Sequence, residues 1–81
     1  MENKTIITSY LVREFLPDVR TDELESDYDL LAGGVIDSLA LLRVVDWITT
    51  EFDLSIDDLD LSPDNFRSVD NISALVASAK S

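Results

Sequence analysis

The sequence predicts an all-α fold, a small four-helix bundle with three main helices, one short helix and a long first loop. The clearest observation is an apolar stripe with helical spacing in the middle of the chain, at Leu41, Val45, Ile48 and Phe52. Proline and serine residues mark the ends of the neighbouring segments, and strand-like alternation occurs only in the very short runs 54–56 and 59–61. The 81 residues fit a single domain, with an ordered core of about residues 5–79.

The first helix is predicted for residues 5–16, and Pro17 ends it because proline disfavours helical continuation. Its inward residues are expected to be Ile7, Tyr10, Leu11 and Phe15, while residues 1–4 are expected to fray. Residues 18–36 then form a long acidic connection. Such loops are uncommon without internal structure, so a turn of helix is expected near residues 21–24. Its apolar contacts with the core are expected from Leu24, Leu30, Leu31, Val35 and Ile36.

The central helix is predicted for residues 40–52, with Val44 beside its apolar stripe. It follows the run Gly33-Gly34-Val35-Ile36-Asp37-Ser38-Leu39 without a break. Either Asp37 or Ser38 can serve as the N-cap, since both side chains offer an oxygen to a backbone N–H of the first turn. The sequence thus places one serine where a glycine-containing loop becomes a helix.

The rest of the chain predicts two further helices. Ile56, Leu59 and Leu61 are expected to hold the loop that follows the central helix against the core. Pro63 suits the first position of a short helix capped by Ser62. Ser68 is expected to cap the last helix, whose inward stripe is Val69, Ile72, Leu75, Val76 and Ala79.

Composition excludes several classes of function. The chain has no cysteine and no histidine, so a disulfide framework, a thiol nucleophile and a Ser-His-Asp triad are excluded, and a transition-metal site is not expected. The formal net charge of -11 argues against nucleic acid and anionic membranes as partners. It favours basic protein surfaces, although plain solubility explains the charge equally well. No segment reads as a membrane span or a secretory signal, so a cytoplasmic location is expected.

Acidic clusters do not predict a metal site or an enzyme. Asp57, Asp58 and Asp60 lack the sixth-position glycine and the final glutamate of a calcium-binding EF-hand loop, and residues 27–29 fail the same test. The surroundings of Ser38 do not match the G-x-S-x-G elbow of hydrolases. A small helical bundle also has little room for a catalytic cleft. An enzyme is therefore not predicted.

The segment Gly34-Val35-Ile36-Asp37-Ser38-Leu39 resembles the G-x-x-D-S-L modification motif of the acyl carrier and peptidyl carrier protein family. The chain length, the place of the motif at the start of the second helix, and residues 61–69 agree with discrete carriers. The resemblance implies that a separate phosphopantetheinyl transferase attaches 4′-phosphopantetheine from coenzyme A to Ser38. It also implies that the thiol of this arm carries an acyl or aminoacyl cargo as a thioester. Asp37 is expected to help orient the metal and coenzyme A of the transferase.

The same resemblance makes the central helix a candidate docking surface. Leu39 and Leu42 lie off the apolar stripe, and both they and Val35 either meet partner enzymes or pack on the neighbouring loop. Arg43 and Asp46 stand where fatty-acid carriers commonly show Glu and an apolar residue. Trp47 is expected to shield an edge of the core or to touch a partner.

The difference from fatty-acid carriers at Arg43 and Asp46 favours a discrete carrier of a specialised biosynthetic pathway. Its expected partners are the transferase, a cargo-loading ligase, adenylating enzyme or acyltransferase, and downstream biosynthetic enzymes, with the chain itself a monomer. The alternative function is an unmodified acidic helical module that binds a basic partner protein.

Overall fold

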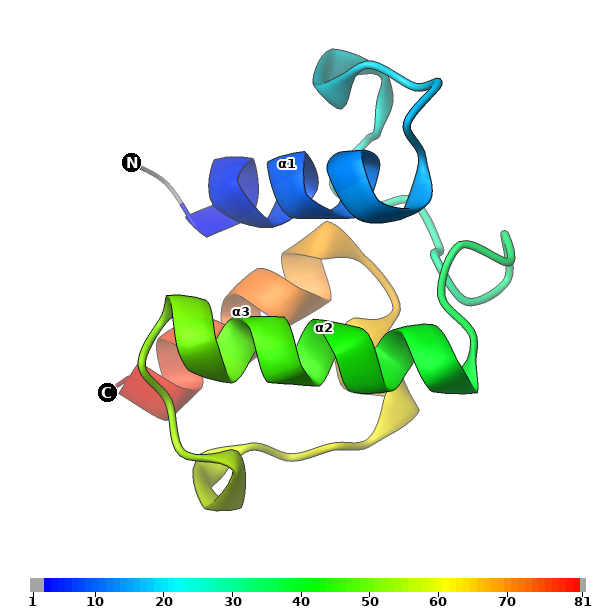
Figure 1. The fold of residues 1–81 in the computed structure, drawn as a ribbon. Coiled ribbons are helices and arrows are strands. Elements are labelled where there is room, and N and C mark those ends of the chain that lie inside the picture. Colours follow the sequence, from blue (N-terminus) through cyan, green and yellow to red (C-terminus); the bar gives the residue numbers. More distant parts are fainter. Residues whose placement is uncertain (1–2, 81) are drawn as a thin grey trace.

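The computed structural model describes residues 3–80, which form three α-helices joined by short 3₁₀ helices. In chain order these are α1 (Asn3–Phe15), η1 (Thr21–Glu23), α2 (Ser38–Glu51), η2 (Ile56–Asp58), η3 (Pro63–Phe66) and α3 (Val69–Lys80). Residues 3–80 contain no strand, and the predicted all-α fold is confirmed. α1 and α2 run across the molecule in opposite directions, with α3 behind them (Figure 1).

The core lies where the three α-helices face one another. Its fully buried side chains come from all three helices, from the first loop and from η3: Ile7, Leu11, Val44, Ile48, Val69, Ile72, Val76, Leu30 and Phe66. Leu41 and Phe52 are only half-buried at the margins of the α2 stripe. The expected helical spacing therefore holds, but it is centred on Val44 and Ile48.

α1 begins two residues earlier than predicted. Asn3 and Lys4 belong to the helix, and the Nζ atom of Lys4 lies 2.9 Å from the carboxylate of Asp70 in α3. This ion pair holds the first turn of α1 against α3, so the expected fraying is wrong for these two residues. Met1 and Glu2 lie outside the described residues.

The connection from α2 to α3 differs from the prediction in its contacts. Leu59 is buried, whereas the side chains of Ile56 and Leu61 are 53% and 42% exposed. The prediction that all three hold this loop is wrong for Ile56 and Leu61, because the contacts of the connection with the core come from Leu54, Leu59 and Phe66 instead.

Ser68 and Ser62 precede helices as predicted, but only Ser68 acts as an N-cap through its side chain. Its buried hydroxyl accepts a hydrogen bond from the N–H of Asn71 at 3.2 Å. Ser62 precedes η3, yet within the described residues its side chain makes no capping hydrogen bond.

Candidate functional site

Asp37 and Ser38 form the start of α2 and take different roles. Asp37 is the N-cap, with extended backbone angles and a carboxylate Oδ1 that accepts the N–H of Ala40 at 2.8 Å. Ser38 is the first helical residue, and its side chain is exposed. Of the two predicted capping residues, Asp37 is therefore the one used. This leaves the Ser38 hydroxyl at the surface, where the N–H groups of a helix start favour an anion.

A compact turn before α2 sets the place of Ser38. The carboxylate of Asp29 accepts the N–H groups of Leu31 at 3.1 Å and Ala32 at 2.8 Å, as aspartate commonly does at turns. The carbonyl of Leu30 accepts the N–H groups of Val35 and Ile36 at 2.9 and 3.2 Å. These bonds fold residues 29–36 back on themselves and direct the chain into the helix.

The two glycines of this turn differ in their surroundings and in their backbone conformation. A Cβ atom on Gly33 would lie 2.0 Å from the hydroxyl oxygen of Tyr28, so the ring of Tyr28 occupies the space that a side chain would need. Gly34 has a φ of 76°, a conformation that is costly for residues with a Cβ. The predicted glycine turn is thus explained by one close contact and one left-handed residue.

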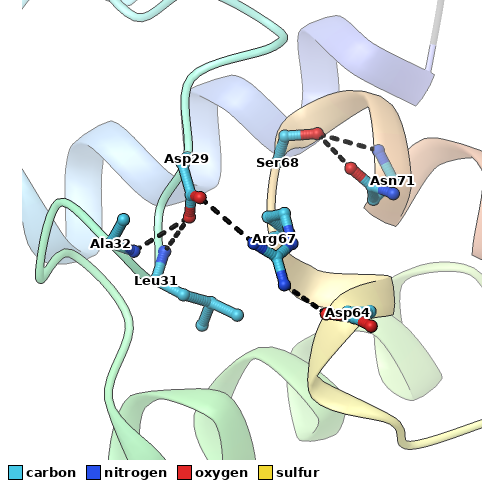
Figure 2. Close-up of polar contacts among 7 residues, drawn as sticks. All are labelled: Asp29, Leu31, Ala32, Asp64, Arg67, Ser68 and Asn71. Carbon is cyan, nitrogen blue, oxygen red and sulfur yellow. Dashed lines mark hydrogen bonds and ion pairs between the residues drawn. The ribbon is translucent and has the colours of Figure 1, made fainter.

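Arg67 fastens this turn to the segment that precedes α3. Its carbonyl accepts the N–H of Leu30 at 2.6 Å, and its Nη1 lies 3.3 Å from Oδ2 of Asp29. Its Nη2 donates to Asp64 of η3, so the guanidinium bridges two carboxylates (Figure 2). The hydrogen bond from Ala32, followed by the positive charge of Arg67, holds the pKa of Asp29 below its ordinary value.

A groove of about 230 Å³ opens beside Ser38. Apolar residues of three segments line it together with Asp37 and Ser38: Leu31 and Ile36 of the first loop, Leu41 of α2 and Pro63 of η3. The exposed serine therefore lies at a largely apolar groove, and the lining residues of the first loop and of η3 form two of its walls.

The predicted docking residues on α2 are partly gathered on one face. Leu39 and Leu42 are 75% and 64% exposed, and Asp46 is also exposed. Their spacing of three and four residues puts them on one side of the helix, next to Ser38. Packing of Leu39 and Leu42 on the preceding loop, the other option in the sequence, would have buried them.

Arg43 lies on the same side of α2 by its spacing, but its side chain reaches α1, and Val35 lies in the preceding loop. Nη2 of Arg43 is 2.9 Å from the carboxylate of Glu14, and the guanidinium lies over the ring of Phe15, so this side chain bridges α2 and α1. Val35 is half-buried and lines a separate groove with Leu16 and Tyr28. Arg43 still has more than half of its side chain exposed, so both residues remain accessible from the surface.

Trp47 covers an edge of the hydrophobic core and does not lie free on the surface. Its ring is stacked on Tyr10 of α1, with ring centroids 4.1 Å apart and planes at 11°. Phe52 meets the other side of Trp47 edge-on at 5.7 Å. The hydroxyl of Tyr10 donates to the carbonyl of Arg43 at 3.4 Å. Burial, followed by the negative charge of Glu14, raises the pKa of Tyr10.

Sequence reasoning missed Arg67 and Tyr28, although both shape the turn that carries Ser38. Arg67 is separated from Asp29 by 38 positions, and no local pattern pairs them. Residues 3–80 contain no group of three or more acidic side chains that could hold a metal ion. They also contain no helix with the length and apolar character needed to cross a bilayer.

Comparison with known proteins finds relatives that span nearly the whole chain. A probable acyl carrier protein, PigG from Serratia sp., is 32% identical over 80 residues, which cover 99% of this chain and 88% of the relative. The structure of KstB-PCP in its apo form is 42% identical with a TM-score of 0.87, and covers 100% of this chain and 89% of its own. The solution structure of KstB-PCP in kosinostatin biosynthesis is 44% identical with a TM-score of 0.72, with coverages of 98% and 89%. No family model matches the sequence.

Proposed function

The chain belongs to the acyl carrier and peptidyl carrier protein family, and from this premise we propose that Ser38 is the attachment site of 4′-phosphopantetheine. Members of this family are carriers and not catalysts. The observation that supports the proposal most directly is the exposed Ser38 at the first position of α2, directly after the N-cap Asp37 and within the motif 34–39. The cap role of Asp37 frees the serine hydroxyl from a structural task.

The attachment is a transfer from coenzyme A. The Oγ atom of Ser38 bonds to the phosphorus that bears pantetheine, the pyrophosphate bond of coenzyme A breaks, and the adenosine bisphosphate leaves. The hydroxyl proton of Ser38 passes to a base of the transferase. The positive end of α2 favours the resulting phosphodiester. The exposed carboxylate of Asp37 is adjacent and is proposed to help orient the metal ion and coenzyme A of the transferase.

The loaded protein is proposed to transport its acyl or aminoacyl cargo between enzymes. The thiol of the arm binds an acyl or aminoacyl cargo as a thioester, and the tether raises the effective concentration of that cargo at each active site. The face formed by Leu39, Leu42 and Asp46 beside the serine is proposed to meet the loading enzyme and the later biosynthetic enzymes. Arg43 and Val35 flank this face. Because coenzyme A and these enzymes are needed, a cytoplasmic location and a specialised biosynthetic pathway are part of the proposal.

The test is intact mass spectrometry after incubation with coenzyme A, magnesium and a broad-specificity phosphopantetheinyl transferase. The wild type is expected to gain one phosphopantetheinyl group, and Ser38→Ala is expected to gain none. Ser62→Ala is a matched control, because Ser62 is also exposed and also starts a helical turn. Absence of any gain in the folded wild type, with a known carrier modified in the same tube, would contradict the proposal and favour the unmodified interaction module.

A further inference from the structure

Arg67 connects three points of the molecule through one residue. Its carbonyl receives the N–H of Leu30, and the two ends of its guanidinium meet Asp29 of the first loop and Asp64 of η3. Figure 2 shows the guanidinium between the two carboxylates. The planar guanidinium of arginine can donate hydrogen bonds to two carboxylates in this arrangement. The single ammonium group of lysine does not reproduce the same geometry.

The two carboxylates belong to the two walls of the groove beside Ser38. On the loop side, Asp29 holds the N–H of Leu31 with its other oxygen, and Leu31 lines the groove. On the η3 side, Asp64 directly follows Pro63, which also lines the groove. The guanidinium therefore joins the two segments that carry these lining residues, the first loop and η3.

We propose that Arg67 is a positioning residue for the modification of Ser38: by bridging Asp29 and Asp64 it fixes the spacing of the two groove walls and thus the presentation of the serine to the transferase. This inference rests on the proposed attachment at Ser38. It concerns geometry rather than stability, because the three side chains are between 37% and 76% exposed, and exposed ion pairs stabilise proteins little.

The first test compares Arg67→Gln and Arg67→Lys with the wild type in the transferase reaction. Arg67→Gln removes the bridge but keeps the backbone bond to Leu30. The specificity constant, kcat/KM, is expected to fall about tenfold, since small displacements of a reacting group lower rates strongly. Arg67→Lys should recover only part of the loss. Arg20→Gln is the matched control, because Arg20 pairs with Asp22 close by in the sequence and is not among the residues that line the groove.

A second variant separates the bridge from the turn. Asp29→Asn keeps an oxygen that can accept the N–H groups of Leu31 and Ala32 but loses the charge that faces Arg67. If the two residues act through one bridge, the double variant Asp29→Asn/Arg67→Gln should lose no more activity than Arg67→Gln alone. Additive losses would overturn the bridge as the cause.

A readout on the unmodified protein keeps the inference distinct from the proposed function. The NMR amide shifts of Leu31, Val35, Ile36 and Ser38 are expected to change in folded Arg67→Gln and to remain as in the wild type in Arg20→Gln. Unchanged shifts, or a wild-type kcat/KM in Arg67→Gln, would overturn the positioning role alone. A wild type that is never modified would instead contradict the attachment at Ser38.

Discussion

Asp37 and Ser38 are neighbours, but the structure predicts different results when each is replaced. Asp37→Ala removes the acceptor for the N–H of Ala40 and is expected to lower the free energy of unfolding by about 1 kcal/mol. Asp37→Asn should cost much less because asparagine also caps helices. Ser38→Ala should change stability by less than about 0.5 kcal/mol. Urea unfolding followed by circular dichroism measures all three, and a larger loss in Ser38→Ala than in Asp37→Ala would contradict this division of roles.

The sequence predicts single residues well where their role is local. The helix start at Asp37 and Ser38, the cap at Ser68 and the turn near residue 21 depend on neighbours within a few positions, so residue type and spacing reveal them. Arg67 and Tyr28 act across space. The contact of Tyr28 with Gly33 and the bridge from Arg67 to Asp29 depend on how the loop folds, and no periodicity encodes that.

The pair α1 and α2 is held at its edge by the stacked rings of Tyr10 and Trp47. Trp47→Ala removes this stack and the contact with Phe52, and it is expected to lower the free energy of unfolding by about 2–3 kcal/mol, somewhat less than for a fully buried aromatic residue. Trp47→Phe, which keeps an aromatic ring, should cost less than half of that. Chemical denaturation by circular dichroism checks both. Equal losses would show that the ring contacts are not the cause.

At the scale of elements, the sequence predicts helices through their apolar spacing and misses what lies outside them. The stripes in α1, α2 and α3 are long enough to reveal each helix. The start of α1 is misplaced because the ion pair between Lys4 and Asp70 joins residues far apart in the sequence, and apolar spacing does not reveal such a contact. Ile56 in η2 and Leu61 in the coil before η3 are misassigned because neither segment is long enough to have a stripe that separates inward from outward residues.

The ion pair between Lys4 and Asp70 predicts a dependence of stability on pH. The hydrogen bond from Lys4 holds the pKa of Asp70 below its ordinary value of 3.8. Because the folded pKa is the lower one, the stabilisation is complete above the unfolded pKa and is lost as the pH falls through the folded pKa. The free energy of unfolding of the wild type should therefore exceed that of Asp70→Asn at pH 6.

The comparison with Asp70→Asn isolates this carboxylate from the other acidic groups, which titrate in both proteins. The difference between the two curves should shrink as the pH falls below 3.8 and vanish once the folded protein is protonated at Asp70. Urea unfolding from pH 6 to acid conditions supplies the curves. A difference that is constant with pH would mean that the charge of Asp70 contributes nothing.

For the whole molecule, the balance between attraction and repulsion of charges decides how salt acts. The chain has seventeen acidic residues and six basic residues. Lys4, Arg13, Arg20, Arg43 and Arg67 already lie in ion pairs, which salt weakens. The remaining carboxylates repel one another, and these like-charged pairs outnumber the ion pairs. The repulsion acts across a molecule whose principal extents are 33 × 28 × 19 Å. The Debye length falls from about 30 Å at 0.01 M salt to about 10 Å at 0.1 M, so added salt screens this repulsion across the molecule.

Stability is therefore expected to rise as NaCl increases from about 0.01 M to about 0.1 M, a range in which screening dominates over specific ion effects. The double variant Asp57→Asn/Asp58→Asn removes two exposed charges from η2 and should be more stable than the wild type at low salt, with a weaker response to NaCl. Thermal unfolding at each salt concentration gives both curves. A wild-type melting temperature that falls with NaCl would show that the ion pairs outweigh the repulsion. The same net charge would then favour basic partners without a cost to the folded state.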